Sequence, residues 1–150
     1  MNRAPAVLRF AAILALIQGI AHGALHVRYV PKHGPLEEAL VASMKTERFV
    51  FAGFSRTYWG FYFGYGLMVV VTCLVQAAVL WFLARLARSR PREVTPLIGM
   101  YGVAYALHAV LAWHYFFTKP VVFDILITAA LGIAAYFSWF DKSGDARARD

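Results

Sequence analysis

The side chains best suited to chemistry begin with three polar residues inside an apolar run. Gln18, His22 and His26 are spaced four residues apart, so a helix places them in one stripe. Imidazole is the commonest metal ligand in proteins, and it also exchanges protons near neutral pH. A membrane helix tolerates such a stripe only where it faces protein or water. The stripe therefore predicts a site inside a helical bundle.

A second group of candidate side chains lies in the second half of the chain. Tyr101, Tyr105 and His108 fall at i, i+4 and i+7, which is one face of a helix. Asp124 lies about one turn inside a later apolar run, where a carboxylate is costly unless it is paired or hydrated. It is therefore a candidate for function.

Asp124 also has ordinary structural explanations. A salt bridge to Lys119 or Arg56 would neutralise it, and a carboxylate near a helix start is favoured by the helix dipole. Each histidine could likewise be a neutral hydrogen-bonding group that joins two helices. The sequence leaves these alternatives open.

Composition places all these residues in a membrane. The chain has 150 residues, of which 61% are hydrophobic and 15% charged, and a soluble domain of this length cannot bury so much apolar side chain. The net charge of +7 does not indicate a nucleic-acid partner, because the basic residues flank apolar runs as topology signals do. The single Cys73 argues against thiol-redox enzymes and Cys-rich metal sites. Hydrolase and nucleotide-binding motifs are absent from the sequence.

The apolar runs predict one all-α domain, an integral membrane four-helix bundle. The expected spans are about 8–28, 58–86, 96–117 and 120–140, each long enough to cross a bilayer. Thr95-Pro96 is expected to cap and start the third helix. Residues 141–150 are expected to be a disordered tail. A cleaved signal peptide is the alternative for the first run, since small residues precede Ala24.

The outer loop, residues 29–57, is predicted to carry an amphipathic helix. Pro35 suits a first helical position, and apolar residues recur at helical spacing from Leu36 to Met44. Such a helix would lie on the membrane surface, or pack over the mouth of the bundle.

The distribution of basic residues predicts the orientation. With four spans, the N-terminal head, the 85–92 loop and the tail share one side and hold nine of the fifteen Lys and Arg residues. The positive-inside rule then places both termini in the cytoplasm.

Aromatic residues and glycines open the second apolar run. The segment reads Tyr58-Trp59-Gly60-Phe61-Tyr62-Phe63-Gly64-Tyr65-Gly66. Aromatic rings at the head of a span are typical of the membrane interface, and Gly60 and Gly64 form a GxxxG pair that admits a neighbouring helix. The neighbour could belong to this chain, to a second copy, or to a partner membrane protein.

The segment from Arg56 to Leu67, together with the histidine-bearing first span, resembles a family of small bacterial four-helix membrane proteins of uncharacterised function. That family carries Tyr-Trp-Asp-Phe-Tyr followed by glycines, and Gly60 stands here in place of the aspartate. The resemblance implies a four-helix fold in the bacterial cytoplasmic (inner) membrane. It implies no activity.

The depth of the polar residues predicts a pocket open to the outside, because all five histidines fall in the outer half of the spans or in the outer loop. We expect this pocket to bind a hydrophobic or amphipathic ligand of the lipid or quinone class. The predicted ligand-binding residues are Gln18, His22, His26, Tyr101, Tyr105, His108 and Asp124.

Three other functions are compatible with the same residues. His22, His26 and His108 could hold a metal ion or haem. A His–Asp pair could transfer protons in a membrane enzyme. An accessory subunit of a membrane complex needs only the small-residue faces. The sequence therefore does not decide whether the protein is an enzyme.

Overall fold

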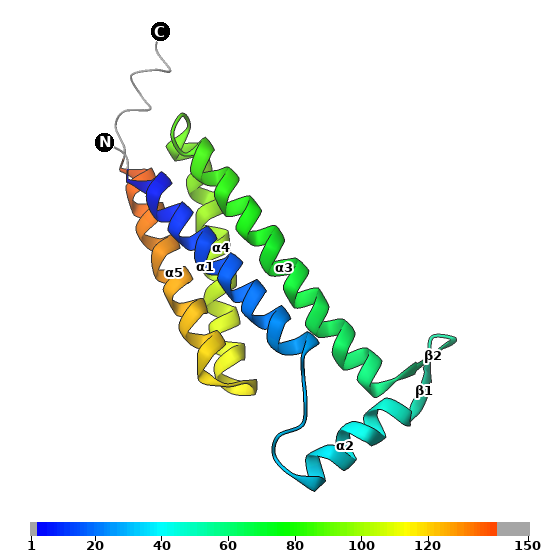
Figure 1. Ribbon diagram of the computed structural model, residues 1–150. Helices are drawn as coiled ribbons and strands as arrows, with labels where there is room; N and C mark the ends of the chain where they lie inside the picture. The colour runs from blue at the N-terminus through cyan, green and yellow to red at the C-terminus, as the bar shows by residue number, and fades with distance from the viewer. Residues whose placement is uncertain (1–2, 141–150) are drawn as a thin grey trace. The chain divides into compact units, whose positions relative to one another are not determined.

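A computed structural model describes residues 3–140 of the chain, so the predicted tail at 141–150 lies outside the described residues. The elements in order are α1 (Ala4–Val27), α2 (Pro35–Thr46), β1 (Arg48–Phe51), β2 (Phe54–Thr57), α3 (Tyr58–Leu86), α4 (Pro91–Tyr115) and α5 (Thr118–Trp139) (Figure 1). Four of them, α1, α3, α4 and α5, are long and apolar enough to cross a membrane. The prediction of four apolar helices in a mainly helical protein is confirmed.

The start of α4 differs from the prediction. The helix begins at Pro91, and Pro96 lies inside it, so the expectation that Thr95-Pro96 starts this helix is wrong. Proline is tolerated in a first turn because its missing N–H would have no intrahelical partner there. Pro91, at the first position of α4, meets this condition, whereas Pro96 lies about one turn farther in. The Thr95 hydroxyl donates a hydrogen bond back to the Pro91 carbonyl at 3.0 Å.

The loop predicted at residues 29–57 holds the predicted amphipathic helix, α2, and also a small β-hairpin that the sequence did not predict. Strands β1 and β2 pair antiparallel, from Arg48 opposite Thr57 to Phe51 opposite Phe54. The reversal is the dipeptide Ala52-Gly53, with φ of 50° and 81°. Two successive positive φ angles are the signature of a type I′ turn, which matches the twist of the paired strands.

The chain divides into two compact units, and each takes part of α1 and part of α3. The first unit is Met1–Gln18 with Cys73–Asp150, and the second is Gly19–Thr72.

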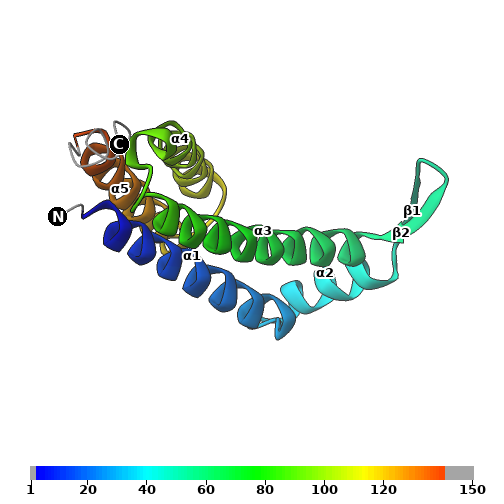
Figure 2. The same cartoon turned by 90° about the horizontal axis from the view of Figure 1, so that it is seen from above.

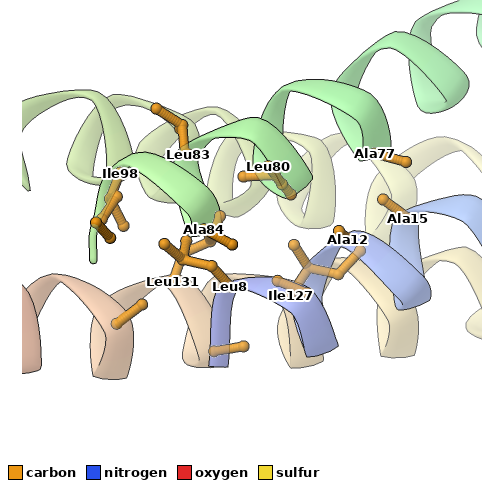
Figure 3. Packing of buried hydrophobic residues seen from close by; sticks show 14 of the residues in the cluster. Leu8, Ala12, Ala15, Ala77, Leu80, Leu83, Ala84, Ile98, Ile127 and Leu131 are labelled. Carbon is orange, nitrogen blue, oxygen red and sulfur yellow. The ribbon is translucent and has the colours of Figure 1, made fainter. Parts of the chain in front are cut away.

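The first unit contains the hydrophobic core (Figure 3). All four long helices contribute to it, and α4 and α5 run side by side (Figure 2). Small residues of α1, α3 and α5 face this core, including Ala12, Ala77 and Ala134, and small residues are what let membrane helices approach closely. Leu80 and Leu131 are completely buried among them.

The second unit is built on the aromatic head of α3. Tyr29, which follows α1, packs on Trp59 with ring centroids 5.7 Å apart. Phe49 of the hairpin packs on Tyr58 at 4.7 Å, and Lys45 of α2 places its ammonium 4.9 Å from the centre of the Trp59 ring. These rings therefore hold the loop elements against α3, with cation–π attraction adding to ring packing.

A single carboxylate fixes the connection between α1 and α2. The Tyr29 hydroxyl donates a hydrogen bond to Glu37, and the backbone N–H groups of Lys32 and His33 donate to Glu37 Oε2 at 2.6 and 2.7 Å. The bond from Tyr29, followed by those from the loop, lowers the pKa of Glu37 to about 2. The same bond raises the pKa of Tyr29. His33, the loop histidine, contacts this carboxylate through Nδ1 at 3.1 Å.

Candidate functional site

Asp124 is the most unusual side chain of the first unit. It lies on α5, about 9 Å along the axis from the first residue of the helix at 1.5 Å per residue, and it is only 3% exposed. The Gln18 amide of α1 donates a hydrogen bond from Nε2 to Asp124 Oδ1 at 2.9 Å. Two of the predicted site residues, far apart in the sequence, are therefore in direct contact.

The partner of Asp124 is not the one that the sequence suggested. In the described part of the first unit, residues 3–18 and 73–140, no Lys or Arg, Lys119 included, forms a salt bridge with this carboxyl group. The Asp124 backbone carbonyl accepts a hydrogen bond from the Thr128 hydroxyl at 2.7 Å. This hydroxyl therefore bonds within its own helix and not to the Asp124 carboxyl group. A neutral amide is thus the hydrogen-bond donor to the carboxyl group.

Polar residues of α3 and α4 lie near this pair. Cys73, Tyr105 and His108 are near enough to interact electrostatically with Asp124. Tyr105 is 1% exposed, and its hydroxyl donates to Gln76 Oε1 at 2.7 Å. We call Gln18, Cys73, Gln76, Tyr105, His108 and Asp124 the Asp124 cluster. It draws on all four long helices, as a site in the interior of a bundle does.

Tyr101 and His108, the other two residues of the predicted tyrosine–histidine face, differ in how far they are buried in the protein. Tyr101 is half-buried and packs against the core. His108 is exposed at the protein surface, with its ring 6.0 Å from that of Tyr105 in an edge-on arrangement. His108 therefore sits at the rim of the cluster and Tyr105 inside it.

His22 and His26 form a separate pair in the second unit. Their rings stack with centroids 5.5 Å apart and planes 14° from parallel. His26 is 8% exposed, and its Nε2 donates a hydrogen bond to the Phe63 carbonyl at 3.0 Å. His22 Nε2 is buried without a hydrogen-bond partner among the described residues, although the Gly66 backbone is close. His26 joins α1 to α3, the structural role that the sequence left open.

The glycines that permit this contact are not the GxxxG pair. A Cβ on Gly66 would lie 2.0 Å from His26 Nε2, and one on Gly23 would lie 3.2 Å from Val70. By contrast, nothing lies within 4 Å of a Cβ on Gly64, and a Cβ on Gly60 would meet only the Thr57 hydroxyl. In the second unit, the close approach of α1 to α3 therefore depends on Gly66 and Gly23, and the Gly60/Gly64 face stays open.

The first unit also has an apolar groove between α4 and α5. Its volume is about 540 Å³, within the range of about 300–1,000 Å³ typical of small-molecule sites. Its lining consists of Ala106, Ala109, Val110, Trp113, Val121, Ile125, Thr128 and Ala129. None of the residues predicted to bind a ligand lines it, and Thr128 is the one hydroxyl-bearing residue among these lining residues.

The residues proposed for a metal ion or haem belong to different units. His22 and His26 lie in the second unit and His108 in the first. Within residues 3–140, no group of three or more His, Cys, Asp or Glu side chains is close enough to hold a metal ion. His114, near the end of α4, is exposed and contacts the Tyr115 ring. The metal and haem functions stay predictions.

Three residues of interest were missed at the sequence level. Gln76 had a usable signal, because it is the one amide in the 29 residues of α3, and an amide in an apolar span needs a partner. Cys73 was considered only as an argument against thiol-redox enzymes and Cys-rich metal sites. Gly66 had no signal of its own, since its importance depends on which side chain lies opposite.

Comparisons of the chain with known protein families, with curated proteins and with solved structures find no match. The likeness of the Arg56–Leu67 segment to a bacterial membrane family therefore stays a resemblance.

Proposed function

We propose that the protein is a multi-pass membrane protein that binds an amphipathic ligand of the lipid or quinone class. The groove between α4 and α5 carries this proposal, because it combines a ligand-sized volume with an almost entirely apolar lining. Small side chains, Ala106, Ala109 and Ala129, form much of the wall, and they leave room for a hydrocarbon or isoprenoid chain.

The position of the groove supports an amphipathic ligand. Trp113 and Val121 lie near the connection between α4 and α5, and Ala106 lies about two turns farther into the span. Tryptophan is enriched where a membrane span meets the headgroup region. A chain bound along Ala106 and Ala109 would place the polar part of its molecule beside Trp113.

Ligand extraction from the purified protein tests the proposal. Ala109→Phe fills the groove, and Val103→Phe places the same ring on an exposed part of α4 that does not line it. We expect a lipid or quinone to copurify in stoichiometric amount with the natural protein and with Val103→Phe. Its amount should fall about tenfold in Ala109→Phe, because the ring occupies the space of the bound chain. Equal amounts in both variants, or no retained ligand in any preparation, would reject the groove as the site.

A second candidate function, an accessory subunit of a membrane complex, has the open Gly60/Gly64 face in its favour. The same preparations distinguish it. A stoichiometric membrane protein partner in the absence of any bound small molecule would support the accessory role and not ligand binding.

We also propose a bacterial inner-membrane location with both termini in the cytoplasm. Nine of the fifteen Lys and Arg residues lie in the N-terminal head, the 85–92 loop and the tail, and this excess supports the orientation. Four candidate spans, an even number, are consistent with two ends on the same side of the membrane.

A further inference from the structure

The Asp124 cluster is independent of the groove, and its chemistry points to a different ligand. An ionised carboxylate inside a bilayer is stable only with compensating charge or water. Asp124 is 3% exposed, and the described part of the first unit places no Lys or Arg in salt-bridge contact with it. The hydrogen bond from the Gln18 amide is neutral and cannot compensate a full charge.

The titratable groups that face Asp124 come from α3 and α4. Cys73 and Tyr105 are neutral in their ordinary protonated forms, and the Tyr105 hydroxyl already donates to Gln76. Among the described groups that interact with Asp124, His108, at the rim of the cluster, is the one that becomes positive by accepting a proton. From α1, the facing group is Gln18, which does not titrate.

Gln18 supplies a further observation. Its Oε1 is buried without a hydrogen-bond partner among the described residues. The oxygen and nitrogen of a glutamine amide are interchanged by a half-turn of the group. After that turn, the Gln18 oxygen can accept a hydrogen bond from a protonated Asp124 carboxyl. The pair therefore provides a partner for the neutral acid as well as for the carboxylate.

We propose that Asp124 is a reversible proton-binding site inside the membrane, with His108 as its proton acceptor. In the resting state the carboxyl group holds the proton and hydrogen-bonds to Gln18. In the transfer step, the O–H bond of Asp124 breaks, an N–H bond forms on the His108 imidazole, and a carboxylate–imidazolium pair remains. His108 lies at the surface of the first unit, so this step moves the proton from the buried carboxyl group to the rim of the cluster.

A hydrophobic carbodiimide tests the protonated state in the intact protein. This reagent adds to protonated carboxyl groups in apolar surroundings and leaves a stable acylurea, which peptide mass mapping assigns to a residue. We expect Asp124 to be labelled at neutral pH and labelling to decline as the pH rises. The exposed carboxylates of Glu38 and Glu93 are internal controls that should stay unlabelled.

Two variants separate proton transfer from burial alone. His108→Gln removes the proton acceptor, so labelling of Asp124 should persist to more alkaline pH than in the natural protein. Leu107→Gln, at an exposed neighbouring position, should leave the pH profile unchanged. Absence of Asp124 labelling at neutral and mildly acidic pH would overturn the proposal.

The same assay distinguishes a proton from a metal cation. Protection of Asp124 by sodium ions at constant pH would identify a sodium site and overturn the proton assignment. The labelled residue is identified in the protein with its natural sequence, so this test needs no substitution at Asp124. Labelling is also independent of ligand extraction, so the groove and the proton site can fail separately.

Discussion

At Gly66, the imidazole of His26 already occupies the space where a side chain would lie. Gly66→Ala should therefore destabilise the protein by about 1–3 kcal/mol, the usual cost of overpacking, although alanine gains about 1 kcal/mol in helix propensity. The free energy of unfolding in detergent, measured by circular dichroism, is the relevant quantity. Gly64→Ala is the matched control, since its Cβ would meet nothing within 4 Å, and it should not lower stability.

The contact with His26 makes this prediction specific. Once His26→Ala has removed the ring, Gly66→Ala should cost much less, so the two substitutions should not be additive. Equal effects of Gly66→Ala and Gly64→Ala would contradict the described packing.

The sequence predicted the positions of side chains correctly where residue type or spacing within one helix was enough. The four-residue spacing indicated that His22 and His26 share a helix face, and their rings do stack. The cost of a buried charge singled out Asp124, which is buried. The importance of Gly66 and the Gln18 partner of Asp124 could not be predicted, because both depend on which helix lies opposite.

At the scale of elements, the hairpin turn carries an avoidable strain. Ala52 has φ 50°, a left-handed conformation that costs an L residue about 1 kcal/mol. Ala52→Asn creates Asn-Gly, the preferred type I′ turn. We expect hydrogen exchange of the β1 and β2 amides to slow about fivefold, as a gain of about 1 kcal/mol implies.

Gly53→Ala provides the opposing test at the same turn. Gly53 has φ 81°, so an alanine there adds strain, and exchange of the same amides should become faster. Unchanged exchange in both variants would mean that the turn does not limit opening of the hairpin.

The elements also differ in how far the sequence predicts them. Apolar length identified the four long helices, since a segment in lipid must satisfy its own backbone hydrogen bonds. The start of α4 was misplaced because Pro91 and Pro96 are both acceptable near a helix start. The hairpin was missed because its strands have only four residues each, too short for a clear alternating pattern.

At the scale of the whole molecule, the sequence allows the predicted ligand-binding residues to be grouped only by their estimated depth in the membrane. Contacts in the structure instead divide these residues between the two compact units. Estimated depth brought the seven predicted ligand-binding residues into one pocket. The structure assigns His22 and His26 to the second unit, and Gln18, Tyr105 and Asp124 to the first. Depth is a single coordinate and does not specify which helices are neighbours, so two residues at equal depth need not share a site.

Orientation, however, is a property of the whole chain that charge counting can predict. Cells expressing single-cysteine variants would test it, with Cys73→Ala as the background. Ala42→Cys marks α2 and Ser89→Cys marks the connection before α4; both positions are exposed, and neither change alters the charge bias. With both termini in the cytoplasm, a membrane-impermeant maleimide should label Ala42→Cys in intact cells and Ser89→Cys only after permeabilisation.

Charge removal then tests the cause of that orientation. Changing Arg85, Arg88 and Arg90 to Gln lowers the count on the proposed cytoplasmic side from nine to six, equal to the six on the other side. Since Lys and Arg bias sets the orientation, part of the population should invert, and Ser89→Cys should become labelled in intact cells. Changing Arg48, Arg56 and Lys45 to Gln removes three charges from the opposite side and should leave the orientation unchanged. Inversion by the second set, or labelling of Ser89→Cys before any charge is removed, would contradict the proposed topology.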